Sequence, residues 1–448
     1  MAQVAHLRLV VLALAFTFAV MVVIGRLAYL GMFAESATSR DGAAALVPLR
    51  ADIVDRNGAP LARTIDAWSV GVQPNNVIGN KRALADDLAR IFPEHDALWF
   101  YSRLKMDAPF TYLALRALPE QVTAVNALGE PGIRFGREPQ RLYPESSMAA
   151  HALGFLDTDG HGQRGMERFL EARLTDPATR DTPVALSLDT RVQAAMESEL
   201  GQAMVSMQAK GAAGIVLDVD TGEIVAMASL PVFNPNKIKG STEDMLRNNV
   251  TQSVYELGSA FKPLTAATAI DKGVVTNIGR RFDATAPLQV GRFKIKDDHP
   301  QNRWLNIPET LIHSSNIATA RIADEIGPER MQAMFRALGF DQRPAIEIRE
   351  KQKPLWPQYW ARTTTMTTAY GHGIAVTPLH LASAYAALVN GGIYRPATLL
   401  KVQGPPPAGR RVFKQSTSDR IRQLLRLIVL DGTGRKAEAQ GYRVHGAA

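Results

Sequence analysis

The sequence predicts an α+β protein, and two observations carry this prediction. The apolar segments Ala213–Val219 and Glu223–Ser229 are joined at Asp220-Thr221-Gly222, an arrangement typical of a β-hairpin. Later segments carry residues that typically begin and end helices. The segment Pro328–Leu338 is followed by a glycine, and another helix is expected to begin at Pro378. A hairpin followed by helices indicates α+β layering and not alternating β-α-β units.

The composition fits a globular chain of two or three domains and excludes several kinds of site. The 448 residues exceed the ~100–200 residues of a usual domain, and 46% of them are hydrophobic. No cysteine is present, which excludes thiol catalysis, disulfides and thiolate metal sites. The nine histidines lack ligand spacing, so neither a metal nor another cofactor is expected.

The net charge of +8 arises from Lys and Arg spread along the chain, with no run longer than Arg280-Arg281 or Arg410-Arg411. A solvated basic surface is therefore expected. Nucleic-acid binding needs a clustered patch and is not expected. Attraction to anionic lipid or wall polymer is compatible with this charge.

The amino terminus predicts a membrane anchor. Residues 9–25 contain no charged side chain and are flanked by Arg8 and Arg26. Continuing the apolar segment to residue 30 gives a helix long enough to span a bilayer, with Arg26 snorkelling. We therefore expect a transmembrane signal anchor over residues 9–30, with residues 1–8 in the cytoplasm and the rest exported. A cleaved signal peptide is the alternative, but the apolar run is long and no small-x-small site closes it.

Two domains are predicted after the anchor. From residue 34 the chain is small and polar, and residues 31–49 are interpreted as a juxtamembrane linker. Residues 50–180 are expected to form a domain of mixed secondary structure. It has a turn-rich start and a helical pattern at Lys81–Phe92. A segment of linker composition ends this domain. The second domain covers residues 181–448.

The first candidate for chemistry is the pair Ser259 and Lys262, in the pattern S-x-x-K. If a helix begins at Ser259, the lysine lies one turn further along the same face. Lysine can deprotonate a serine only when neutral, and with a pKa near 10.4 it is neutral about one time in 2,500 at pH 7. Burial or a second positive group must lower this pKa for the pair to work.

The S-x-x-K pattern is weak by itself, because Ser102-Arg103-Leu104-Lys105 matches it too. That copy lies in an ordinary amphipathic stretch and is interpreted as surface. A second motif supports the first: Ser314-Ser315-Asn316 precedes an apolar helix. A serine and an asparagine two residues apart on a tight turn can face one cleft. Read alone, each motif is also compatible with a simple helix cap.

The combination of S-x-x-K and S-x-N resembles the penicillin-recognising serine enzymes, and the surrounding chain resembles their class B penicillin-binding proteins. The resemblance covers nearly the whole chain. The S-S-N form is most similar to the division-specific, septal members, since elongation-specific relatives usually carry Asp where Asn316 stands. The resembling blocks are residues 50–62, 141–174, 213–236, 255–263 and 369–392.

The resemblance implies a fold. After the transmembrane helix come a pedestal domain of the dimerisation type over residues 50–180 and a serine transpeptidase domain over residues 181–448. The latter has an antiparallel sheet with helices on both faces. The implied location is the bacterial inner membrane, with a single pass, the amino terminus inside and the catalytic part in the periplasm.

The resemblance also implies roles for residues. Ser259 is the acylated nucleophile and Lys262 its base, while Ser314 and Asn316 form the second active-site element. The G-x-G-x-x-x-T-P segment implies substrate binding by Gly371, Gly373 and Thr377.

The implied reaction is D,D-transpeptidation of peptidoglycan. The serine is acylated by the D-Ala-D-Ala end of a stem peptide, and an amine on a neighbouring strand resolves the acyl-enzyme. β-Lactams acylate the same serine. The implied partners are a membrane glycosyltransferase of the division type and other septal proteins. No cofactor is implied.

The sequence departs from the family at its end. Residues 441–446 resemble the approach to the K-T-G strand, and the chain stops at Ala448. The third motif, which binds the substrate carboxylate and completes the oxyanion hole, is therefore expected to be missing. We expect the chain as written to be a truncated form whose catalytic domain folds poorly and is nearly inactive, because exposing ~1,000 Å² of apolar surface costs about 25 kcal/mol.

Two other functions stay open at this point. A β-lactamase or β-lactam sensor shares the nucleophile motif, but the blocks at 50–62 and 141–174 argue against it. A membrane-anchored division scaffold without catalysis fits the chain as written, because the anchor and pedestal do not depend on the third motif. Labelling with penicillin separates this scaffold from both enzymes.

Overall fold

A computed structural model of the protein describes residues 16–18, 20–23 and 49–446. Most of the anchor expected over residues 9–30 lies outside these described residues, as do the expected cytoplasmic residues 1–8. Among the residues that are described, no helix is both long enough and apolar enough to cross a membrane.

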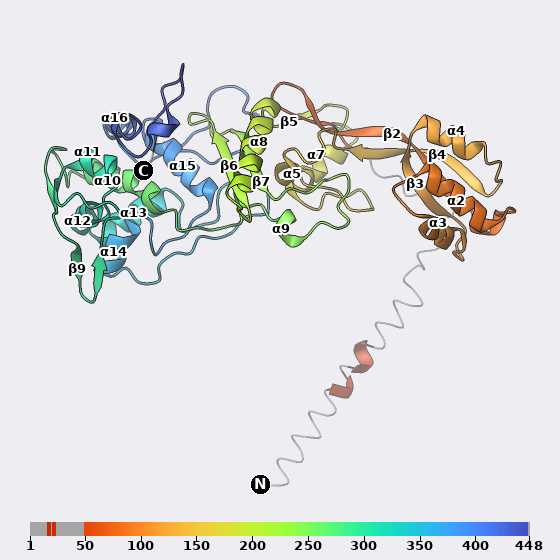
Figure 1. The fold of residues 1–448 in the computed structure, drawn as a ribbon, viewed down its shortest axis with the longest axis horizontal. Helices are drawn as coiled ribbons and strands as arrows, with labels where there is room; N and C mark the ends of the chain where they lie inside the picture. Colours follow the sequence, from red (N-terminus) through yellow and green to blue (C-terminus); the bar gives the residue numbers. More distant parts are fainter. Residues whose placement is uncertain (1–15, 19, 24–48, 447–448) are drawn as a thin grey trace, which may run out of the picture. The chain divides into compact units, whose positions relative to one another are not determined.

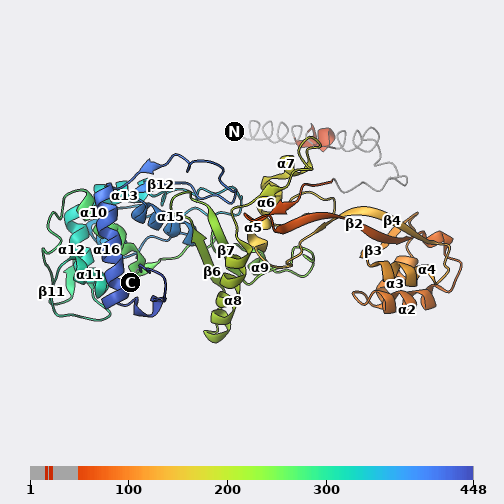
Figure 2. The ribbon, with the colours of Figure 1, turned by 90° about the horizontal axis from the view of Figure 1, so that it is seen from above.

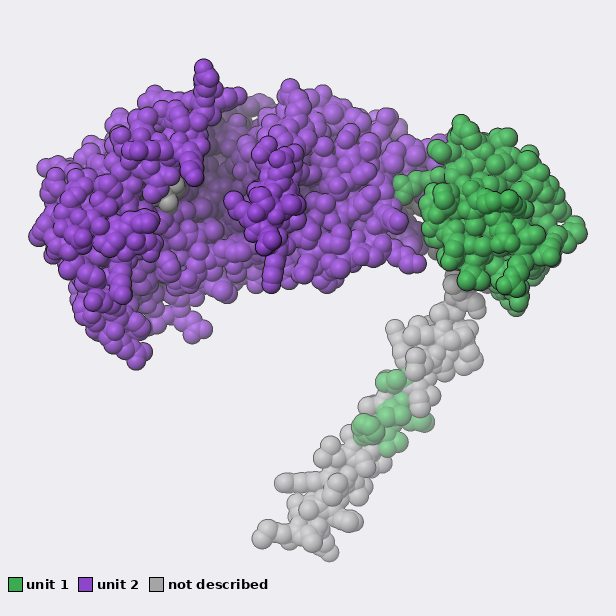
Figure 3. Space-filling view, viewed as in Figure 1, with its two compact units in different colours: residues 1–48, 68–139 green, residues 49–67, 140–448 purple. Residues whose placement is uncertain are grey.

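The described chain divides into two compact units, coloured separately in Figure 3. Unit 1 includes residues 68–139, and unit 2 includes residues 49–67 and the chain from residue 140 onward. Residues 140–180 thus pack within unit 2, although the sequence placed them in the first domain. The functional boundary at residue 180 stays a prediction.

Residues 68–139 of unit 1 form strands of a sheet and the helices α2, α3 and α4 (Figure 1). β2 is central in this sheet because both β3 and β4 pair with it. Asn80 caps α2 by accepting hydrogen bonds from the backbone N–H groups of Arg82 and Ala83. The helix predicted at Lys81–Phe92 is confirmed by α2. The elements are β2 (Pro60–Val72, its carboxyl half in this unit), η1 (Pro74–Asn76), α2 (Lys81–Ile91), α3 (Ala97–Leu104), β3 (Thr111–Ala117), α4 (Pro119–Asn126) and β4 (Ile133–Leu142).

The first part of unit 2 joins segments that are far apart in the sequence. Strand β1 pairs antiparallel with the start of β2 and parallel with β5. Beside it, Arg50 and Arg141 both bind the carboxylate of Glu167, whose side chain is fully buried. The elements here are β1 (Ile53–Val54), α5 (Ala150–Leu153), α6 (Gly165–Phe169), α7 (Glu171–Thr175) and β5 (Val184–Ala185).

The predicted hairpin is confirmed as β6 (Ala212–Leu217) and β7 (Ile224–Leu230), which pair antiparallel. Side chains alternate between the two faces of a strand, so each face of the hairpin has its own set of side chains. Helices cover both faces. Gly214 faces α8 (Thr190–Ser206), where a Cβ would lie 2.8 Å from Leu200 Cδ1. On the other face, Ile215 packs into the core that contains Leu379 of α15 (Pro378–Val389). Figure 2 shows α8 and α15 beside the hairpin.

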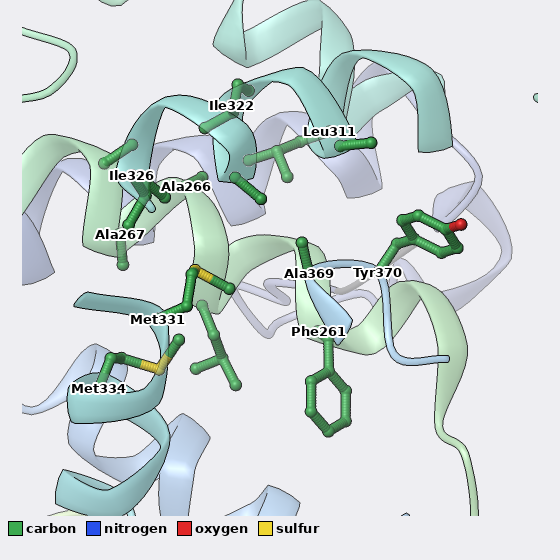
Figure 4. Packing of buried hydrophobic residues seen from close by; sticks show 14 of the residues in the cluster. Phe261, Ala266, Ala267, Leu311, Ile322, Ile326, Met331, Met334, Ala369 and Tyr370 are labelled. Carbon is green, nitrogen blue, oxygen red and sulfur yellow. The ribbon is translucent and has the colours of Figure 1, made fainter. Parts of the chain in front are cut away.

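The remaining helices form one cluster around α10 (Lys262–Asp271), in which nine of ten residues are buried. A helix that is buried on all sides lies at the centre of a core. Small residues such as Ala266 and Ala267 let the neighbouring helices approach it, as Figure 4 shows. The surrounding helices are α11 (Ile307–Ile312), α12 (Asn316–Ile326), α13 (Pro328–Ala337), α14 (Arg362–Thr368) and α16 (Gln415–Asp431).

Short pairs of strands lie beside this cluster. β8 (Phe282–Ala284) pairs with β11 (Arg303–Leu305), and β9 (Leu288–Val290) pairs with β10 (Phe293–Ile295). The remaining elements are β12 (Ile393–Tyr394), β13 (Arg410–Arg411), α9 (Glu243–Leu246), η2 (Gly258–Phe261) and η3 (Arg435–Ala437).

Candidate active site

Ser259 lies in the 3-10 turn η2, and the α-helix α10 begins after it, at Lys262. An α-helix starting at Ser259 was expected from the sequence, and the structure has a 3-10 turn there instead. Pro263 accounts for the difference: it has no N–H, and its fixed φ suits the first turn of an α-helix. The preceding Gly258 has φ of +56°, a conformation that glycine adopts readily.

The Lys262 side chain is buried and makes three hydrogen bonds within the site. Its Nζ donates to Ser259 Oγ at 2.7 Å, to Ser314 Oγ at 2.8 Å and to the Ser314 carbonyl at 2.7 Å. Ser314 Oγ also donates to Ser259 Oγ at 2.9 Å. An ammonium has three donors, so all of them are used here. The structure therefore brings together three of the four predicted catalytic residues.

Burial lowers the pKa of Lys262 from 10.5 to about 8, while the negative charges of Asp297 and Asp298 oppose this change. Burial acts in this direction because it disfavours the charged form of a lysine. With a pKa of about 8, roughly one lysine in ten is neutral at pH 7. Lys262 needs a lowered pKa to act as the base for Ser259, and its burial provides it.

Ser314 and Asn316 take different positions around the amino terminus of α12. Ser314 has φ of +54°, which directs its side chain and its carbonyl toward Lys262. Ser315 caps the helix by accepting a hydrogen bond from the Ala318 N–H. Asn316 Nδ2 donates to the Lys296 carbonyl at 3.0 Å, so it holds the neighbouring loop, and no hydrogen bond to Ser259 or Lys262 is present among the described residues.

Asp297 supports this turn and was missed by the sequence argument. It is buried, and its carboxylate accepts hydrogen bonds from Ser315 Oγ at 2.8 Å and from the Ile317 N–H at 2.9 Å. A carboxylate at a helix amino terminus is also stabilised by the helix dipole. No local pattern reveals this role, because the contact joins residues 18 and 20 positions apart.

Gly371 and Gly373 lie beside the turn that carries Ser259. A Cβ on Gly371 would lie 2.3 Å from the Gly258 carbonyl oxygen, so only glycine allows this approach. The Gly373 N–H donates to Glu256 Oε1 at 2.9 Å, and Glu256 is a second residue that the sequence argument missed. Substrate binding by the two glycines stays a prediction. Their position near Ser259 is compatible with it.

Thr377 is placed differently from the other predicted residues. Its side chain is fully buried and caps α15, accepting a hydrogen bond from the His380 N–H, while His380 Nδ1 lies 2.8 Å from its hydroxyl. In the structure the threonine fixes the start of the helix that packs against the hairpin. Substrate binding by Thr377 stays a prediction.

The second S-x-x-K copy is confirmed as surface. Ser102 and Lys105 are both exposed, and the Ser102 hydroxyl donates to the Trp99 carbonyl. Only the copy at Ser259 and Lys262 therefore combines burial of the lysine with a hydrogen bond to the serine.

The arrangement can perform nucleophilic catalysis. A neutral Lys262 amine can accept the Ser259 proton directly, and the Ser314 hydroxyl, which contacts both, can pass a proton to a leaving group. Within the part of the chain that the structure describes, no cluster of three or more His, Asp or Glu side chains could hold a metal ion.

Two family descriptions match the chain. Residues 212–446 match the "Penicillin binding protein transpeptidase domain", and residues 45–176 match the "Penicillin-binding Protein dimerisation domain". The first match contains Ser259, Lys262 and Ser314. The second contains Arg50, Arg141 and Glu167.

Individual proteins of this family are similar over most of their length. The probable peptidoglycan D,D-transpeptidase FtsI of Caulobacter vibrioides is 39% identical over 402 residues, which cover 89% of this chain and 68% of the relative. FtsI of Escherichia coli K12 is 29% identical, with 97% of this chain and 78% of the relative covered.

A solved structure supports the same assignment. Penicillin-binding protein 3 of Mycobacterium tuberculosis, complexed with aztreonam, has a TM-score of 0.68 and 25% identity, covering 89% of this chain and 80% of that one. The matches span the catalytic and the dimerisation regions alike. The chain therefore belongs to the penicillin-binding protein transpeptidase family, as a class B member of the cell-division type.

Proposed function

We propose that this chain is a peptidoglycan D,D-transpeptidase of septal wall synthesis and a target of β-lactams. The observation that carries the proposal is the hydrogen-bonded cluster of Ser259, Lys262 and Ser314, with the lysine buried. The names of the relatives support the same reaction.

In the acylation step, Ser259 Oγ attacks the carbonyl of the penultimate D-Ala while neutral Lys262 takes its proton. The bond to the terminal D-Ala breaks, and its amine leaves with a proton that Ser314 delivers. An amine of a second stem peptide then attacks the ester and releases Ser259. The oxyanion is stabilised by preorganised donors, of which the Ser259 N–H is one.

The location and assembly of the protein are parts of the same proposal. We infer a single membrane pass over residues 9–30 and a periplasmic catalytic part, supported by the uncharged segment of residues 9–25. A division-type membrane glycosyltransferase and other septal proteins are the proposed partners.

Covalent labelling with a fluorescent penicillin tests the function. The membrane-inserted chain is compared with its Ser259→Ala variant and with a version continued through a K-T-G strand. Covalent labelling that depends on Ser259, either in the chain itself or in the extended version, supports the proposal. The comparison of these two shows whether the third motif is required. If neither form takes up label through Ser259, or if the drug is rapidly hydrolysed, the transpeptidase proposal fails.

A further inference from the structure

The β9–β10 hairpin carries a row of cations that the catalytic cluster does not use. β10 and the residues beside it run through Arg292, Lys294 and Lys296, all of which are exposed. Lys294 lies in β10 and Lys296 directly follows it, so their side chains lie on one face of the extended chain, about 7 Å apart, while Arg292 lies in the turn that joins β9 to β10. The opposite face carries Ile295 and, across the pair, Val290, both of which are buried in the core. We call these three cations the basic edge.

The cations of the basic edge form no ion pair with a described residue, and the acidic residues next to them in the chain are the buried Asp297 and the exposed Asp298. Among the residues that the structure describes, no salt bridge involves Arg292, Lys294 or Lys296. The other cations of this region are paired: Arg280 binds Glu325, and Arg303 binds Glu309. The Arg292 guanidinium lies over the ring of Phe293, which is itself 52% exposed. A surface of this kind is open to an anionic ligand.

The basic edge is attached to the active site through its last residue. The Lys296 carbonyl accepts a hydrogen bond from Asn316 Nδ2, and the next residue, Asp297, accepts from Ser315 Oγ. Ser314, which contacts Ser259, directly precedes these two donors in the chain. A strand bound along Arg292, Lys294 and Lys296 is therefore led toward the catalytic serine.

From this continuity and charge we propose that the basic edge binds the carboxylates of a peptidoglycan strand and aligns it with Ser259. The inference rests on the proposed function, since it names the chemistry of the substrate at that site. Stem peptides carry free carboxylates at intervals, which suits a row of cations and not a single pocket. Phe293, whose ring lies 5.1 Å from the Arg292 guanidinium, offers an apolar surface beside that cation for the uncharged parts of the strand. An anionic membrane is the competing ligand, but it would not need the connection to Asn316 and Ser315.

The test is binding of the full chain to purified sacculi. The double variant Arg292→Gln/Lys294→Gln is compared with the wild type and with Arg330→Gln/Arg420→Gln, which removes two other exposed cations on α13 and α16. We expect the first double variant to bind about three- to tenfold more weakly at low salt, with a smaller difference at high salt, and the second to bind as the wild type does. Sacculi whose carboxylates have been converted to amides should bind the wild type and the first double variant equally weakly.

Three outcomes would overturn the inference. Equal weakening in both double variants would show an effect of total charge. Unchanged binding of Arg292→Gln/Lys294→Gln would show that the edge does not bind peptidoglycan. Weaker binding to phosphatidylglycerol vesicles, with sacculus binding intact, would assign the edge to a membrane surface. Cooperative unfolding of each variant serves as the folding control. A failure of Ser259-dependent penicillin labelling would remove the proposed function without altering these binding results.

Discussion

At the scale of the residue, the chemistry of the site depends on where Lys262 is placed. Its folded-state pKa of about 8 lies below the ordinary 10.5 because the side chain is buried. Between these two values the unfolded chain holds the proton and the folded chain does not, so the unfolding free energy rises with pH across this window. Below pH 8 the protein carries the cost of a buried cation, which three hydrogen bonds partly offset.

The pH dependence of acylation follows from this pKa. We expect the rate of Ser259 acylation by penicillin to rise about tenfold per pH unit between pH 6 and 8, and to level off above pH 8, because only neutral Lys262 accepts a proton. Rate constants measured from pH 6 to 9 on a labelling-competent form check this. Lys262→Arg, which stays charged throughout, should acylate about 10²- to 10⁴-fold more slowly than the wild-type plateau, with no rise between pH 6 and 8. A flat profile would mean that another group is the base.

Asp297 is expected to act on the same lysine in two ways. Its negative charge raises the pKa of Lys262, and its hydrogen bonds hold the turn of Ser315. Asp297→Asn should therefore move the midpoint of the acylation profile below pH 8 and also lower the plateau rate. Asp298→Asn is the matched control, because Asp298 raises the same pKa yet is exposed. It should shift the midpoint and leave the plateau unchanged. A plateau lowered equally in both variants would contradict the positioning role.

At the scale of the element, the site is assembled where turns meet. The turn η2 carries Ser259, the turn before α12 carries Ser314, and Gly371 contacts the first of these. Each turn contains a residue with positive φ: Gly258, Ser314 and Gly371. The two glycines adopt positive φ readily, whereas Ser314 is strained there, and such strain persists where the surrounding structure holds the residue in place.

Gly371→Ala tests this packing of turns. The new Cβ would lie 2.3 Å from the Gly258 carbonyl oxygen, so the Ser259 turn must move. We expect acylation to fall more than tenfold. Gly327→Ala is the control, since Gly327 has the same φ of +81° but would place its Cβ in open space. That variant should lose only the ~1–3 kcal/mol of a strained backbone conformation in thermal unfolding and should acylate normally. Equal loss of acylation in both would show backbone strain to be the cause.

The elements themselves were largely predictable from the sequence, because their signals are local. The hairpin β6–β7 is marked by its turn residues, and α15 by Thr377 before Pro378 and by glycines at its end. Ser259, Lys262 and Ser314 were found through short motifs. The contacts of Asp297 and Glu256 were not, because they depend on how separate loops meet in space. The buried position of Thr377 was missed for the same reason.

At the scale of the whole molecule, distant segments are joined by buried charges that no local pattern reveals. Within unit 2, Arg50 and Arg141 bind Glu167 from 117 and 26 residues away. Arg50 Nη2 lies 3.0 Å from one carboxylate oxygen, and Arg141 Nε lies 2.7 Å from the other. The Tyr143 hydroxyl also donates to this carboxylate, whose charge, together with burial, raises the pKa of the tyrosine well above its usual range.

Glu167→Gln is therefore expected to destabilise unit 2 strongly. The substitution keeps the shape of the side chain but removes the counter-charge of the buried Arg141, and it leaves Arg50 with only Glu171, 2.9 Å away. Breaking a buried pair costs roughly 3–5 kcal/mol. Glu243→Gln is the control, because the Glu243 side chain is 87% exposed and lies 3.9 Å from Arg164. Surface pairs of that kind contribute about 0–1 kcal/mol. Chemical denaturation of the two variants measures both values. If Glu167→Gln cost no more than Glu243→Gln, the three segments would be held by apolar packing around Met166 and Leu174 instead of by the charges.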